Sequence, residues 1–276
     1  CARTADLAAQ QPPASFEPVP GDPRPHRLCR CGRRFRFPAG PANLAAAHLP
    51  GVPALEDIGL AHGLARFLHL LLFVYWLGGD AGVFYSSSFV VNPKLSRDAR
   101  MTAAKIFLDL DMLPRYCMAL MLTVGGILAE LVGITHPTWE MVAIVLLGPV
   151  WLALVVLVHA KEGSAAGQTL KRVDVWFRWI VIASIVASVA HSHWTGRLAG
   201  LEWFSAKLLI FAFLVFCGLM IRRLLPPFIE GFRTLATTGP TPESDRLMID
   251  GLARCRPWVL AIWAGILLSA LLGILK

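Results

Sequence analysis

Long apolar runs alternate with short polar segments over most of the chain after residue 58. Met141–Ala160 and Pro257–Leu275 contain no charged residue, and two shorter runs, Trp179–Gly196 and Leu208–Ile221, are similarly apolar. About 20 apolar residues in a helix cross the ~30 Å hydrocarbon core of a bilayer. The pattern therefore predicts six membrane-spanning helices. Their expected positions are about 62–90, 112–134, 141–161, 175–195, 202–223 and 256–275.

The composition agrees with this pattern and narrows the fold class. Hydrophobic residues make up 56% of the chain and charged residues only 16%, whereas soluble domains have about a quarter charged. The sequence predicts an all-α, polytopic membrane helix bundle in contact with lipid. The net charge of +8 does not indicate nucleic-acid binding, because most basic residues flank the apolar runs, where they orient a membrane protein.

Residues 1–58 have a different character from the rest of the chain. Prolines recur there among Arg, Ala and Gly, with no period of 2 or 3.6, so we expect a disordered Pro/Arg-rich extension. The six-span domain then occupies 59–276. Because the first methionine is Met101, we hypothesise that part of this segment is not native and that the natural start lies shortly before His62.

The loops between the predicted spans differ in basic residues. The loops after the first, third and fifth spans are rich in Lys and Arg, whereas Thr135–Glu140 has none and Thr195–Leu201 has only Arg197. Basic loops stay on the cytoplasmic side of a membrane. The sequence therefore predicts a bacterial cytoplasmic membrane protein with both termini outside the cytoplasm, although the basic residues within 1–58 run against that orientation.

This orientation predicts the depth of the polar residues inside the spans. Those expected in the outer third are His69, Glu130, His191, His193 and Lys207. Near the inner side, Asp80 could pair with Arg115, or Arg115 could extend to the lipid headgroups. Ionisable residues inside a membrane are by default candidates for a functional site.

Histidines at matched depth are candidate ligands of a metal or of haem iron. In helical bundles such sites are built from facing helices. His69 together with His191 or His193 could hold a haem, and Lys207 or Arg197 could neutralise its propionates. The alternatives are that His191 and His193 are interfacial residues and that His69 binds a neighbouring helix. Copper is a further alternative, but Met118 and Met121 lie away from the histidines.

The first span carries a family resemblance. The run Phe67-Leu-His69-Leu-Leu-Leu-Phe-Val-Tyr-Trp76-Leu-Gly78-Gly79 resembles the first span of a superfamily of bacterial membrane proteins that includes HemJ-type protoporphyrinogen oxidases and CopD-type copper-resistance proteins. Trp203-Phe-Ser-Ala-Lys207-Leu-Leu is similar to a later span of the HemJ type. The resemblance implies that His69 ligates haem iron and that Lys207 belongs to the haem or substrate pocket. The chain differs from the HemJ type in having two more spans and Phe216-Cys217-Gly218 where that type has a histidine pair.

Together these features predict a protein that binds b-type haem near the outer face and acts in electron transfer or a membrane-linked oxidation, as an oxidoreductase or its electron-transfer subunit. Trp76 would pack beside His69, and a redox protein or a quinone would be the partner. The alternatives are a CopD-like copper or small-ion transport protein and a structural subunit without cofactor. The repeat Gly265-x3-Ser269-x3-Gly273 predicts close helix packing, within the chain or in an oligomer.

Overall fold

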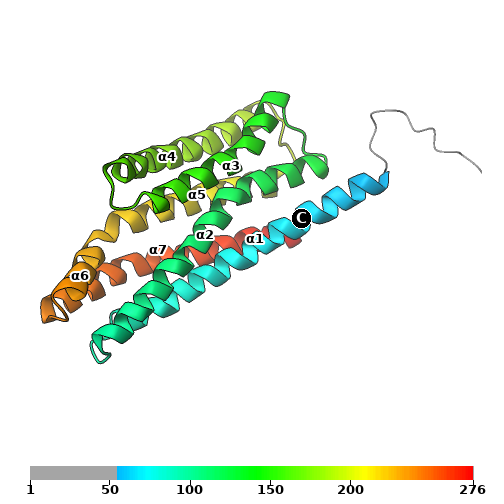
Figure 1. Cartoon of the computed structure of the whole chain (residues 1–276). Helices are drawn as coiled ribbons and strands as arrows, with labels where there is room; N and C mark the ends of the chain where they lie inside the picture. The colour runs from blue at the N-terminus through cyan, green and yellow to red at the C-terminus, as the bar shows by residue number, and fades with distance from the viewer. Residues whose placement is uncertain (1–54, 276) are drawn as a thin grey trace, which may run out of the picture. The chain divides into compact units, whose positions relative to one another are not determined.

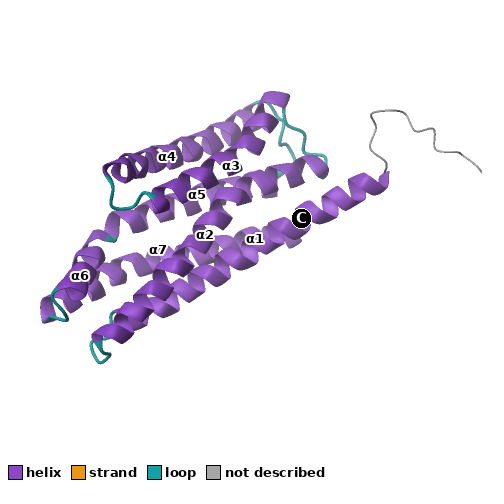
Figure 2. Ribbon diagram, viewed as in Figure 1, coloured by secondary structure: helices purple, strands orange, loops and turns teal. Residues whose placement is uncertain are grey.

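The computed structural model describes residues 55–275, all of them in helices and connecting loops (Figure 1; Figure 2). The helices are α1 (Leu55–Val90), α2 (Arg97–Leu131), α3 (Thr138–Ala160), α4 (Ala165–Trp194), α5 (Glu202–Leu224), α6 (Pro226–Thr237) and α7 (Pro242–Ile274). All but α6 are long and apolar enough to cross a membrane. This confirms the all-α fold with six candidate transmembrane helices, and the chain is a multi-pass membrane protein. The predicted extension over residues 1–58 lies almost entirely outside the described residues, although 55–58 are helical.

The six long helices run alternately in opposite directions, and consecutive ones pack together (Figure 1). The α1–α2 and α3–α4 connections and α6 lie at one end of the bundle, which we call the basic end because the Lys- and Arg-rich loops are there. The other end, the opposite end, holds the α2–α3 and α4–α5 connections and the end of α7 (Figure 1). Helix α7 packs along α5 and α6 and also contacts α1.

A threonine side chain of α2 connects the two helices by forming hydrogen bonds with the backbone of α3. The Thr123 hydroxyl donates to the Ile144 carbonyl at 2.6 Å and accepts from the Gly148 amide at 2.8 Å. A regular helix pairs these two backbone groups, which are four residues apart, with each other. Gly148 has no side chain to obstruct Thr123, so the two helices approach closely at this point.

The small-residue face predicted on the last span packs inside the chain. A Cβ atom placed on Gly265 would lie 2.7 Å from Leu214, and one on Gly273 would lie 2.6 Å from the Lys207 Nζ atom. Both neighbours belong to α5. The expected close packing is therefore present between α7 and α5, and an oligomer through this face stays a prediction.

Several helices are longer than the spans expected from hydropathy. Helices α2, α4 and α7 begin at Arg97, Ala165 and Pro242, ten or more residues before the predicted spans at 112, 175 and 256. Pro114 and Pro257, which stand near the starts of the predicted spans at 112 and 256, consequently lie inside helices. The segment between the fifth and sixth predicted spans holds α6 and the first part of α7.

Many large apolar side chains point out of the bundle. Those more than half exposed include Leu70 and Val74 on α1, Val150 on α3, Ile180 on α4 and Leu267 on α7. A soluble monomer rarely exposes apolar surface on this scale. The exposed surface is consistent with contact between these helices and lipid acyl chains.

Candidate functional site

The imidazole of His69 lies against helix α2. Its Cε1 atom would be 3.1 Å from a Cβ atom placed on Gly125, so the absence of a side chain at Gly125 provides the space for the ring. The Nδ1 atom is buried and has no hydrogen-bond partner in the structure. A buried polar atom without a partner is costly, which marks His69 as a residue whose role is not explained by its neighbours in the chain.

Lys207 of α5 reaches the same part of the bundle. Its ammonium group interacts electrostatically with His69. The same group lies 5.8 Å from the ring centre of Trp203 and next to Gly273 of α7. The structure thus brings together two residues predicted from separate spans. We call His69, Gly125, Trp203, Lys207 and Gly273 the His69 site, and α1, α2, α5 and α7 contribute to it.

His191 and His193 lie elsewhere, in the last turn of α4, and both are exposed. Helix α4 packs against α3 and α5, whereas α1 packs against α2 and α7. Among residues 55–275, no three His, Cys, Asp or Glu side chains gather closely enough to hold a metal ion. His69, His191 and His193 therefore do not form one cluster of protein ligands.

Arg197, a predicted partner for propionates, is engaged in a polar cluster between α3 and α4. Its guanidinium forms an ion pair with Glu140 at 2.8 Å and donates to the Ser192 hydroxyl at 2.8 Å. The Ser188 hydroxyl also donates to Glu140. These contacts tie the α4–α5 connection to the start of α3.

Glu130, also expected at this depth, caps a turn. It accepts hydrogen bonds from the backbone amide of His136 at 2.9 Å and lies 2.8 Å from the His136 Nδ1 atom. The partner is six residues away, in the α2–α3 connection. Glu130 thus stabilises that connection and forms its hydrogen bonds with His136, not with His69.

Trp76 belongs to the main hydrophobic core. It is 4% exposed, and its ring meets Phe211 of α5 edge to face, with centroids 6.2 Å apart. The same tryptophan lies near Asp80, one turn further along α1. Trp76 therefore links α1 to α5 between the His69 site and Asp80.

A buried charged cluster, which was not among the residues predicted from the sequence, lies towards the basic end. Asp174 of α4 accepts from the Arg178 Nε atom at 3.0 Å and also pairs with Arg222 of α5. Asp174 and Arg178 are fully or almost fully buried. The signal in the sequence was their spacing of four, which places both on one face of a helix at the edge of an apolar run.

Arg115 pairs with Asp111, four residues earlier on α2. The expected pair between Arg115 and Asp80 is therefore wrong, and an extension of the partly exposed Arg115 to lipid headgroups stays a prediction. Asp80 instead lies beside Asp111 and Trp76, and its Oδ2 atom is buried without a hydrogen-bond partner.

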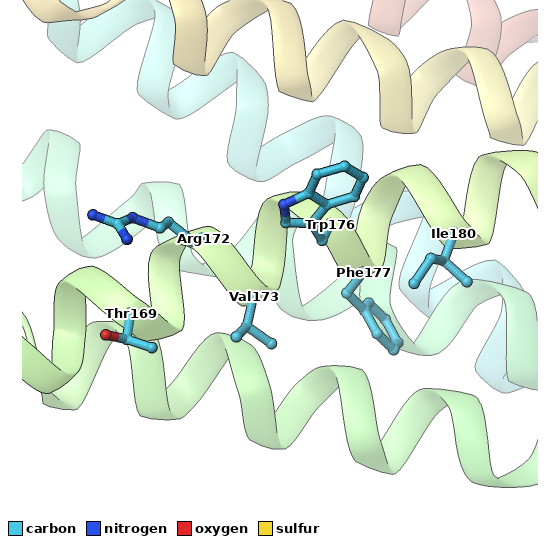
Figure 3. A pocket seen from close by; sticks show the side chains of 6 residues that line it. All are labelled: Thr169, Arg172, Val173, Trp176, Phe177 and Ile180. Carbon is cyan, nitrogen blue, oxygen red and sulfur yellow. The ribbon is translucent and has the colours of Figure 1, made fainter.

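Two surface grooves of residues 55–275 show how the outer faces of the helices are built, and His69 lines neither of them. Figure 3 shows the groove along α4, where Thr169, Arg172, Val173, Trp176, Phe177 and Ile180 line it. The other lies between α1 and α2, beside Tyr75 and Tyr116. Both are lined mainly by apolar side chains, as expected for surfaces that face lipid.

The His69 site thus offers an imidazole with an unpartnered nitrogen, a cation from a second helix and glycines from two others. This arrangement can hold an anionic, flat group only where the neighbouring side chains leave room for it. Comparison of the chain with family models, with curated proteins and with solved structures finds no match.

Proposed function

We propose that this multi-pass protein of a bacterial cytoplasmic membrane binds one b-type haem at the His69 site and serves in electron transfer or in a membrane-linked oxidation. The observation that carries the proposal is the buried, unpartnered Nδ1 atom of His69, which lies within electrostatic range of the cationic Lys207. A neutral imidazole in a membrane bundle is the usual protein ligand of a b-type haem. The resemblance of the His69 run to the HemJ/CopD superfamily supports the same assignment.

The residues of the site differ in what each would do. His69 would be a nitrogen ligand of the iron, and Lys207 would balance the charge of a propionate, since a cation inside a membrane is stabilised by an anionic partner. Gly125 leaves the space in which the imidazole lies. Haem supplies one-electron chemistry, and the electron partner would be a second membrane redox protein or a quinone.

Other predicted ligands are left out of the proposed site. His191 and His193 are exposed on α4, and Arg197 is paired with Glu140. We therefore assign only His69 as a protein ligand of the iron.

The test is the visible absorption spectrum of the full chain purified in detergent from cells that make haem. We expect a Soret band that is lost in His69→Ala and retained in His62→Ala. His62 is a matched control because it lies two turns earlier on the same helix and has no polar contact within the described residues. Lys207→Met should weaken haem retention without abolishing the band.

Two results would contradict the proposal. The first is a purified protein without a Soret band, and the second is a band that His69→Ala leaves unchanged. Metal analysis of the same samples gives the copper content, so that stoichiometric copper lost in His69→Ala would favour the copper-transport alternative.

A further inference from the structure

The cluster formed by Asp174, Arg178 and Arg222 lies in the interior of the bundle between α4 and α5. Arg178 reaches the centre of four helices: its Nη1 atom is 3.5 Å from the Met118 sulfur on α2, and its guanidinium lies 5.5 Å from the ring centre of Trp151 on α3. An arginine in this position is held by one carboxylate, that of Asp174, which it shares with Arg222.

The hydrogen bonds of this cluster are incomplete. The Arg178 and Asp174 side chains are only 3% and 1% exposed. The Nη2 atom of Arg178 and the Oδ1 atom of Asp174 nevertheless have no hydrogen-bond partner. Native proteins leave few buried polar atoms unpaired, and each one requires an explanation. A water molecule could complete these hydrogen bonds, but it could not change the charge of the cluster.

The charge of the cluster is also unbalanced. Two guanidinium groups share one carboxylate, which leaves one positive charge in a buried position. The next charged groups, Arg115 and Asp111, form a balanced pair that acts on Arg222 but leaves the excess in place. Asp80 interacts with Asp111 and has no ion pair with either arginine of the cluster. An uncompensated charge is strongly unfavourable in a membrane interior, so an anion would be stabilised here.

The outer residues of this region are partly exposed, whereas the inner ones are buried. The side chains of Arg222, Arg115 and Asp111 are 27%, 34% and 28% exposed, in contrast to Arg178 and Asp174. Arg222 is in the last turn of α5, where the chain leaves the apolar region. A ligand that approaches from this end would meet Arg222 first and Arg178 behind it.

We propose that Arg178 and Arg222 form a binding site for an oxyanion, the phosphate or carboxylate group of a small anion or of a lipid headgroup. Guanidinium groups recognise such oxygens with two parallel hydrogen bonds, and Arg178 still has a free donor in Nη2. Bound oxygen atoms would balance the excess charge and satisfy that donor. This site is separate from the His69 site and does not depend on haem.

The experiment compares anions with the full chain in phosphatidylcholine nanodiscs. In one arm inorganic phosphate or acetate is titrated against chloride at equal ionic strength. In the other, nanodiscs contain increasing phosphatidylglycerol. The thermal unfolding midpoint and tryptophan fluorescence report binding, since a ligand that binds only the folded state raises the midpoint with its concentration, and Trp151 lies over Arg178.

Arg222→Gln is the decisive variant, and Arg223→Gln is its matched control. Both remove one positive charge at the end of α5, but Arg223 is exposed and lies outside the cluster. Arg222→Gln leaves Arg178 and Asp174 as a balanced pair, so the apparent Kd should weaken about tenfold or more, the effect of losing a charged hydrogen bond. Arg223→Gln should leave it within about twofold, as is usual for surface substitutions.

A midpoint increase in either arm, selective over chloride and lost in Arg222→Gln, supports the site, and the arm that responds identifies the source of the oxyanion. The proposal is overturned if the wild-type protein responds equally to chloride and to the oxyanions, a result that requires no variant to fold. It is also overturned if both variants weaken binding equally, because the effect would then be one of surface charge.

Discussion

Arg100 is fully buried, and its guanidinium joins three helices. Its Nε atom donates to the Val90 carbonyl at the end of α1, at 2.8 Å, and an Nη atom forms an ion pair with Asp245 in the first turn of α7, at 2.7 Å. The last carbonyls of a helix have no partner within it, so this contact satisfies one of them. Arg100 therefore fixes the end of α1 against α2 and α7.

Removal of this side chain should destabilise the protein strongly. Arg100→Ala leaves the Asp245 carboxylate and the Val90 carbonyl without their partner, and breaking a buried ion pair costs about 3–5 kcal/mol. Chemical denaturation in detergent measures the free energy of unfolding. Lys105→Ala, an exposed cation on the same helix, should change it by less than about 0.5 kcal/mol. Equal effects of the two substitutions would show that Arg100 is not a structural link.

Gly125 tests whether the position of the His69 ring matters for cofactor binding. A leucine at this position would occupy the space of the imidazole, because even its Cβ atom would lie 3.1 Å from Cε1. Gly125→Leu should therefore displace the ring and reduce the Soret absorbance per protein, while Gly78→Leu should not. Gly78 is the control because a Cβ atom there would meet nothing within 4 Å. An intact band in Gly125→Leu would place the haem outside the His69 site.

The sequence allowed some site residues to be identified and concealed others. His69 and Lys207 stood out because each interrupts an apolar run, and the alternation of the loops put them at one depth. Asp174 and Arg178 were overlooked because they precede an apolar run, where charged residues usually face water. Their burial depends on the positions of α2, α3 and α5 around them, and no pattern within a single helix contains that information.

Glycines set the close approach of α6 to α7. A Cβ atom on Gly251 of α7 would lie 2.8 Å from the backbone nitrogen of Phe228, and one on Gly231 of α6 would lie 2.6 Å from the Ser244 carbonyl oxygen. Backbone atoms cannot move aside as the end of a flexible side chain can. The contact between these two helices therefore requires glycine at both positions.

Substitution of one of these glycines should loosen α6. Gly251→Ala forces the helices apart and should lower the free energy of unfolding by about 1–3 kcal/mol, as overpacking usually does. Limited proteolysis should cut 225–241 faster in this variant than in the wild type. Gly78→Ala lies in open space and should not change the cleavage rate. Unchanged cleavage in Gly251→Ala would mean that α6 is not held by this contact.

Helix ends were harder to predict than membrane spans. Hydropathy marks where the chain is apolar enough for lipid, and it placed all six spans. The helices α2, α4 and α7 continue beyond the lipid because capping residues begin them earlier: Ser96, Ser164 and Thr241 each accept a hydrogen bond from an amide in the first turn. The buried residues Arg100 and Met248 belong to these extensions, so they were assigned to loops.

At the scale of the whole molecule, the two ends of the bundle differ in chemistry. The opposite end holds the His69 site and the ion pair between Glu140 and Arg197. The basic end holds the cluster around Asp174 and the helix contacts made by Arg100. If both proposals hold, a redox group and an anion would occupy opposite halves of one membrane protein, and Trp76 and Asp80 would lie between them on α1.

The orientation of the bundle decides which compartment each site faces. Because basic loops remain in the cytoplasm, we expect Thr238→Cys, at the basic end, to react with a membrane-impermeant maleimide only after cells are permeabilised. Thr135→Cys, at the opposite end, should react in cells with an intact cytoplasmic membrane. Both positions are exposed, so the reagent can reach either one in the folded protein. The substitutions are made in a chain whose natural cysteines are replaced by serine, and that chain without either substitution serves as the control.

The reverse labelling pattern would mean that the His69 site faces the cytoplasm and that the anion site faces away from it. Soluble cytoplasmic anions could then no longer be the ligands of Arg178 and Arg222.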